Sequence, residues 1–213
     1  TDKGGYRHYM MKEIHEQPDS VRRTLEGRIT DKQVLINAFG AEAESIFSQT
    51  KAVQIVACGS SFYTGLVAKY WCEQIVGVPC HVEIASEFRY RKVAVQPNTL
   101  MVTISLSGET ADTLAALRDA TDENYLASLC LCNVPNSSLV RESDLCLMIN
   151  AGPEICVAST KAFTNQLTDL MLLVLALAKS QGMSPEDEAG YVSALNSVPS
   201  LLKETLSRDS EIK

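Results

Sequence analysis

The feature that most constrains the fold of this chain is a repeated alternation of short apolar runs with longer stretches of helical period. Parallel strands need crossover connections, and the helices that make them cover the sheet, so this order is typical of a parallel sheet buried on both faces. We therefore expect an α/β fold: a three-layer αβα sandwich with a five-stranded, doubly wound parallel sheet, right-handed crossovers and extra helices at both ends. The predicted strands cover 52–59, 78–85, 98–105, 125–133 and 145–151.

Helical stretches lie between these strands and on both sides of them. The first fifty residues are polar and helical, with two short amphipathic helices on either side of Gly40. We expect residues 1–40 to form a linker or helical arm and residues 41–213 to form the α/β domain. The remaining predicted helices cover 60–77, 86–95, 109–124, 137–144, 159–182 and 184–209.

Composition excludes several classes of function. The net charge of −7 argues against a nucleic-acid partner, because phosphate backbones select basic surfaces. Seven cysteines with apolar neighbours suggest reduced, buried thiols and a cytoplasmic location, and three scattered histidines make a metal site improbable. No signal peptide is visible, and the apolar run Leu170–Ala178 is about half of the roughly 20 residues that a membrane span needs. We expect no membrane partner and no cofactor.

Hydroxyl side chains cluster where three of the predicted strands end. They occupy 60–61 after the first strand, 105–110 after the third and 159–160 after the fifth. Ligands of open parallel sheets bind at the carboxyl ends of the strands, where helix N-termini offer unpaired N–H groups and a partial positive charge. Three such helix N-termini together would bind an anion such as a phosphate, with no need for a lysine side chain.

Each cluster taken alone has a simpler explanation, because Ser and Thr are also the preferred residues at helix N-caps. The turns after the first and third strands are expected beside the point where the strand order reverses, which favours a phosphate site there. No Walker loop is present, and the glycines of "CGSSFYTG" have the wrong spacing for a dinucleotide fingerprint. The residues therefore leave a phosphate site and simple capping both open.

Five motifs in order resemble a known family. "ACGSS", "SLSGETADT" and "VASTKAFTNQL" resemble the motifs of sugar isomerase (SIS) domains. Together with "YRHYMMKEIHEQP" and "VEIASEFRYR" they make almost the whole chain similar to the first of two SIS domains in bacterial-type glutamine:fructose-6-phosphate amidotransferases. The resemblance implies the SIS fold and a site for fructose 6-phosphate or glucosamine 6-phosphate.

The resemblance also implies roles for particular residues. In this sequence "SLSGET" has Leu106 where the family usually has glutamine, so a side-chain amide contact is lost although the backbone N–H can still donate. The implied phosphate-binding residues are Ser61, Ser105, Leu106, Ser107 and Thr110, and the implied sugar-contacting residues are Cys58, Gly59, Ser60, Val157 and Ser159.

The resemblance further implies that this chain is one part of a larger enzyme. The family adds a glutaminase domain and a second SIS domain, forms homodimers, and carries its acid–base groups outside the matched region. No catalytic residue is therefore expected here. Two other functions stay open: a SIS module that senses a phosphosugar, and a stand-alone SIS aldose–ketose isomerase.

Three residues near the clusters look reactive but have simpler interpretations. We expect Glu109 to complement the dipole of the helix that it begins. Lys161 is expected to be solvated or ion-paired at the surface. Cys58 has no recognisable His or Asp partner, so we expect its small side chain to be buried and to fill space in the core.

Overall fold

The sheet contains five strands, all parallel, in the order β2-β1-β3-β4-β5. The structure, a computed structural model, describes residues 2–121 and 124–211. This topology confirms the predicted α/β class and places the reversal of strand order between β1 and β3. The strands are β1 (Ala52–Ala57), β2 (Cys80–Ile84), β3 (Thr99–Ser105), β4 (Ala127–Cys132) and β5 (Leu145–Met148).

The central strands are apolar because both of their faces are buried. Every residue of β1 and β3 is buried. Successive side chains of a strand point to opposite faces, so Ile55 joins the main core cluster while its neighbour Val56 joins a second cluster on the other face. The register pairs Ile55 with Val102 and aligns the carboxyl ends of β1 and β3.

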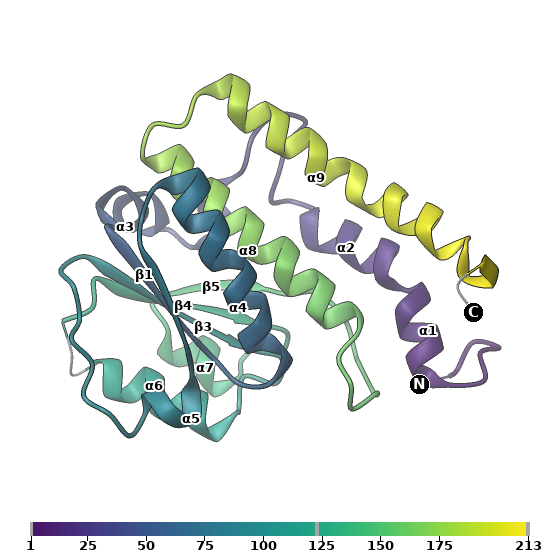
Figure 1. Cartoon of the computed structure of the whole chain (residues 1–213), viewed down its shortest axis with the longest axis horizontal. Coiled ribbons are helices and arrows are strands. Elements are labelled where there is room, and N and C mark those ends of the chain that lie inside the picture. The colour runs from purple at the N-terminus through teal and green to yellow at the C-terminus, as the bar shows by residue number, and fades with distance from the viewer. Residues whose placement is uncertain (1, 122–123, 212–213) are drawn as a thin grey trace.

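Helices cover both faces of the sheet, as expected for a three-layer sandwich. In Figure 1, α4 and α8 lie on one face and α5, α6 and α7 on the other. The 3₁₀ helix Ile36–Phe39 and the short π-helix Cys72–Val76 belong to the same layer as α4 and α8. The helices are α1 (Tyr9–His15), α2 (Gln17–Leu25), α3 (Ala43–Gln49), α4 (Ser60–Trp71), α5 (Ala85–Phe88), α6 (Ala111–Thr121), α7 (Ser138–Glu142), α8 (Lys161–Ser180) and α9 (Pro185–Leu206).

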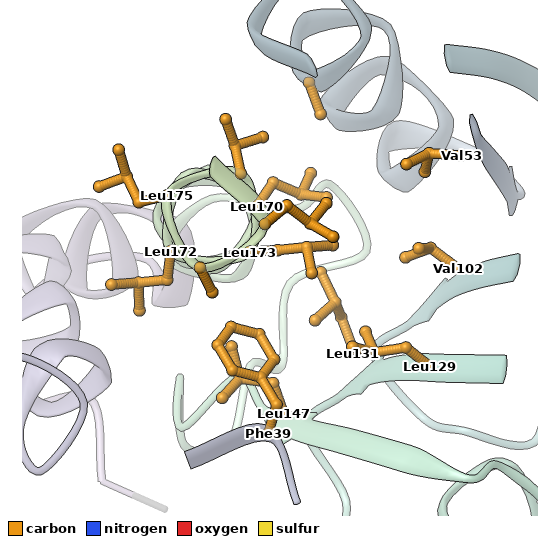
Figure 2. Packing of buried hydrophobic residues seen from close by; sticks show 14 of the residues in the cluster. Phe39, Val53, Val102, Leu129, Leu131, Leu147, Leu170, Leu172, Leu173 and Leu175 are labelled. Carbon is orange, nitrogen blue, oxygen red and sulfur yellow. The ribbon is translucent and has the colours of Figure 1, made fainter. Parts of the chain in front are cut away.

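The long helix α8 organises the main core. Leu170 and Leu173 point toward the sheet, where Figure 2 places them near Val102, Leu131 and Leu147. Residues 172–177 are at most 1% exposed, since α8 is covered by the sheet on one side and by α2 and α9 on the other. This sandwiched position accounts for the long apolar run of α8. Among the described residues, no helix is long and apolar enough to cross a membrane.

The N-terminal segment packs on the domain through a buried polar network. Asn165 of α8 donates to Ser20 Oγ at 2.8 Å and to Thr24 Oγ1 at 2.7 Å. Arg28 forms a buried ion pair with Asp169 at 2.7 Å. Burial raises the pKa of the Asp169 carboxyl well above its ordinary value, and Arg28 partly opposes this shift. The proposed boundary near Gly40 remains a prediction, and residues 1, 212 and 213 of that division lie outside the described residues.

Two predicted helices differ from the structure in extent. The helix expected over 86–95 ends at Phe88 as α5. The chain leaves the helix at Arg89, Arg91 pairs with Glu83, and Val93 packs against the second core cluster. The helix expected over 109–124 begins at Ala111, and residues 122–123 of that prediction lie outside the described residues.

Gly65 of α4 offers a test of how tightly α4 packs on the sheet. A Cβ at this position would meet Val82 Cγ1 at 2.9 Å and Ile55 Cγ2 at 3.0 Å. We expect Gly65→Ala to lower the free energy of unfolding by about 1–3 kcal/mol in urea titrations, because the packed sheet cannot yield. The matched control is Gly190→Ala in α9, where a Cβ would meet nothing within 4 Å. This substitution should stabilise the helix by about 0.5–1 kcal/mol, because alanine has the higher helix propensity. Equal effects of the two substitutions would contradict this packing.

Candidate functional site

A pocket of about 450 Å³ opens at the carboxyl ends of the strands. It lies at the reversal of strand order, which is where open α/β sheets bind ligands. Its volume is in the range of small-molecule sites. The lining residues are Cys58, Ser61, Ile104, Ser105, Leu106, Ser107, Thr110, Asn133, Val134, Pro153 and Glu154.

The turn from β1 into α4 forms one wall of the pocket. Gly59 is the N-cap of α4, with φ 58° and ψ −138°. A glycine has no side chain to cap the helix, Gly59 and Ser60 are exposed, and no side chain caps the N-terminus of α4 in the described structure. Ser61, buried in this first turn, lines the pocket. The turn therefore combines a helix N-terminus with a small hydroxyl, a combination that suits an anion.

The turn from β3 into α6 forms the facing wall, and its own hydroxyls hold it in shape. Ser105 Oγ accepts a hydrogen bond from Gly108 N at 3.0 Å and lies 3.0 Å from Thr110 Oγ1. Ser107 Oγ accepts from Glu109 N at 3.2 Å. These bonds use part of the hydrogen-bonding capacity of the hydroxyls, so they support a role for these side chains in shaping the turn. Ligand binding by them stays a prediction.

Gly108 is the point at which this turn meets the loop after β4. Its φ is +68°, and a Cβ would lie 2.1 Å from Ser137 Oγ and 2.6 Å from Cys132 Sγ. The carbonyl oxygen of Gly108 accepts from Leu139 N at 3.1 Å, and that of Leu106 accepts from Asn133 N at 3.2 Å. The β3 turn is therefore fixed by a neighbouring loop as well as by its own side chains.

Glu109 caps a helix, but not the one expected. Helix α6 begins at Ala111, and the Glu109 carboxylate instead accepts from Ser138 N at 2.7 Å, at the N-terminus of α7. This hydrogen bond holds the pKa of Glu109 below its ordinary value. The prediction of capping is right in kind and wrong in its target. Glu109 thereby links the β3 turn to the loop after β4.

Glu154, which sequence reasoning missed, lines the pocket and caps α8. Its Oε1 accepts from Thr160 N at 3.0 Å and from Ala162 N at 3.1 Å, and its Oε2 accepts from Ser159 Oγ at 3.1 Å. The N-terminus of α8 is thus bound to a carboxylate of the same chain, so of the three predicted hydroxyl clusters those in the β1 and β3 turns remain candidates for an anion site. The spacing of an acid five or six residues before a Ser-Thr pair that opens a helix was the available signal.

Of the remaining predicted residues, Cys58 lines the pocket, whereas Gly59, Ser60, Val157 and Ser159 are not part of its lining. Gly59 and Ser60 flank the β1 turn, and Ser159 reaches the pocket only through Glu154. Val157 is fully exposed on the loop before α8. Cys58 lines the pocket and is half-buried, so it is more accessible than the buried filler we expected.

Two further residues complete the description of the site. Asn133 lines the pocket and fixes the loop after β5, donating to Gly152 O at 2.9 Å and accepting from Ala151 N at 2.8 Å. Lys161 is buried, not solvated, and its Nζ pairs with Glu16 at 2.6 Å. Across the described part of the chain, no cluster of three or more His, Cys, Asp or Glu side chains is placed to hold a metal ion.

The fold and this pocket define a SIS domain. Residues 46–176 match the family model of the SIS domain, and the chain belongs to that family. The pocket lies between two of the motifs that carry the resemblance.

Several named proteins are similar to this chain over its whole length. It is 60% identical over 214 residues to a protein of Pseudomonas syringae pv. tomato named glutamine–fructose-6-phosphate aminotransferase [isomerizing], and 55% identical over 212 residues to the protein of that name from Escherichia coli K12. The C-terminal domain of glucosamine-fructose-6-phosphate aminotransferase from Francisella tularensis has a TM-score of 0.97 and 48% identity, with 100% of this chain and 60% of that chain covered. Each of these two alignments covers 100% of this chain but 35% of the relative, so the chain spans about a third of the length of the relatives that it matches.

Gly108→Ala tests how closely the β3 turn contacts the loop after β4. We expect it to lower the free energy of unfolding by more than about 2 kcal/mol, because a positive φ costs an alanine about 1–2 kcal/mol and the clash with Ser137 adds overpacking. The control is Gly77→Ala, at φ +80° with open space around its Cβ, which should show the conformational cost alone. Equal losses for both variants in denaturant titrations would show that the close approach has no energetic weight.

Proposed function

We propose that this chain is the sugar-phosphate-binding part of a glutamine–fructose-6-phosphate aminotransferase, the enzyme that makes glucosamine 6-phosphate from fructose 6-phosphate and glutamine. The observation that carries the proposal is the convergence of the β1 and β3 turns on one pocket. Names of relatives at 55–60% identity supply the substrate class. In this proposal Ser61, Ser105, Leu106, Ser107 and Thr110 bind the phosphate in the pocket. The proposed sugar contacts are Cys58 in the pocket wall and Gly59, Ser60, Val157 and Ser159 around it.

The proposed role is to anchor a dianion at the end of the substrate that does not react. Free N–H groups of α4, backbone donors of the β3 turn and small hydroxyls supply hydrogen bonds without filling the pocket. Leu106 contributes its backbone, and its side chain packs against the core in place of an amide contact. A fixed phosphate orients the rest of the hexose, and this positioning lowers the barrier to reaction at the far end.

We assign no acid–base step to this part of the protein. The ionisable side chains in the pocket lining are Cys58 and Glu154, and the carboxylate of Glu154 is occupied by α8. In the proposed enzyme, a second SIS domain and a neighbouring subunit of a homodimer supply the groups that move protons, and a glutaminase domain supplies ammonia. A cytoplasmic location fits the seven cysteines, which are all free thiols.

Calorimetry with glucosamine 6-phosphate tests the anchoring role directly. The 213-residue chain should bind this ligand weakly and should bind glucosamine without its phosphate at least tenfold more weakly. No interconversion of fructose and glucose 6-phosphates should be detectable. Turnover by this chain would favour a stand-alone isomerase, and equal binding of both ligands would contradict phosphate anchoring.

Ser107→Ala separates ligand binding from capping. The exposed Ser107 hydroxyl makes one long bond inside the turn, so we expect the variant to weaken glucosamine 6-phosphate binding about tenfold with a nearly unchanged melting temperature. Ser48→Ala, an exposed serine of α3 that bonds only its own helix, should change neither quantity. A stability loss of about 1 kcal/mol with unchanged affinity would mean that Ser107 is only a cap.

A further inference from the structure

We propose that Glu13 of α1 is a positioning residue for the sugar-phosphate pocket. It holds the loop between β5 and α8, residues 149–160, against the N-terminal helix. This inference rests on the proposed function, because it assumes that the pocket binds a phosphorylated sugar. Figure 1 shows α1 beside this loop, although the two are far apart in sequence.

The contacts of Glu13 are directed at the backbone of the loop. Its Oε1 accepts from Ile155 N at 2.6 Å and from Cys156 N at 3.3 Å. The side chain is 3% exposed, and its Oε2 is buried without a hydrogen-bond partner among the described residues. Burying a carboxylate is unfavourable, so an apolar residue would serve the packing of α1 at least as well. The two amides explain why an acid stands at this position.

The held amides lie next to the wall of the pocket. Pro153 and Glu154 line the pocket, and they directly precede Ile155 and Cys156. Pro153 also lines a second cavity of about 260 Å³, on the α1 side, together with Glu13. The segment at Pro153 is therefore a partition with the sugar-phosphate pocket on one side and α1 on the other.

A second contact fixes the other end of the loop to the same helix. Glu16, the C-cap residue of α1, pairs with buried Lys161, the first residue of α8, at 2.6 Å. Between these two attachments Val157 is fully exposed, and Ser159 and Thr160 are held by Glu154 of the same loop. Glu13 thus acts with Asn133, which holds Ala151 and Gly152, and with the N-terminus of α8, which binds Glu154, to set where this wall stands. It does so without touching the ligand itself. Loss of Glu13 should let this wall move away from the β1 and β3 turns.

The test compares Glu13→Ala, Glu13→Gln and the control Asp19→Asn in the 213-residue chain. Asp19 lies at the same α1-side cavity but pairs only with exposed Arg22. For Glu13→Ala we expect a dissociation constant for glucosamine 6-phosphate about tenfold higher and at least tenfold faster hydrogen exchange at the Ile155 and Cys156 amides. Glu13→Gln keeps an acceptor oxygen, so both the dissociation constant and the exchange rates should stay near their wild-type values. Asp19→Asn should change neither quantity. If the alanine variant fails to fold, Glu13→Asp, whose shorter side chain cannot reach the loop amides, gives the same comparison.

Each outcome decides the proposal. Unchanged affinity in Glu13→Ala, with or without faster exchange, would overturn the positioning role while leaving the proposed function intact. Equal loss in Glu13→Gln and Glu13→Ala would also overturn it, because the role depends on an acceptor oxygen. Absence of binding by the wild-type chain would overturn the proposed function and this role with it, a result distinct from a difference between variants.

Discussion

The parallel pairing of β1 with β3 is the constraint on which the rest of the structure depends. Their register aligns two strand ends at the point where the chain winds to opposite sides, so the turns into α4 and α6 must meet. Gly65 lets α4 approach β1 and β2 closely, and α8 closes the same face of the sheet. The pocket is therefore a consequence of topology, and hydroxyl side chains from both turns line it.

Carboxylates fasten the loops around this pocket to one another. Glu109 joins the β3 turn to α7, Glu154 joins the β5 loop to α8, and Glu13 joins that loop to α1. Each acid accepts from backbone N–H groups at a helix start or in an irregular loop, where a charged acceptor is strongest. This arrangement reconciles an acidic chain with the proposed anion site, because Glu109 and Glu154 beside the pocket are engaged by backbone amides.

The sequence predicted the parts of this structure that local patterns determine. The strands, the parallel sheet, the helical layers and the hydroxyl turns follow from apolar periodicity and from Gly, Ser and Thr at strand ends. It did not predict the target of Glu109, which lies 29 residues away, or the burial of Lys161, whose partner Glu16 lies 145 residues away. Asn133 was missed for the same reason, since loops after different strands become neighbours only when the sheet is assembled. Glu154 differs, because its contacts with Ser159 and Thr160 are local and only its place in the pocket wall depends on the assembled sheet. The roles of the predicted site residues stay predictions until a ligand is bound.

Amide NMR during titration with glucosamine 6-phosphate is the most direct test of the central claim, that the β1 and β3 turns together bind the phosphate of a sugar. The account predicts saturable shifts concentrated at the N–H groups of Ser60, Ser61 and Leu106–Gly108, reproduced by inorganic phosphate and absent with glucosamine. Shifts centred on the N-terminus of α8, or no shifts at either turn, would contradict it.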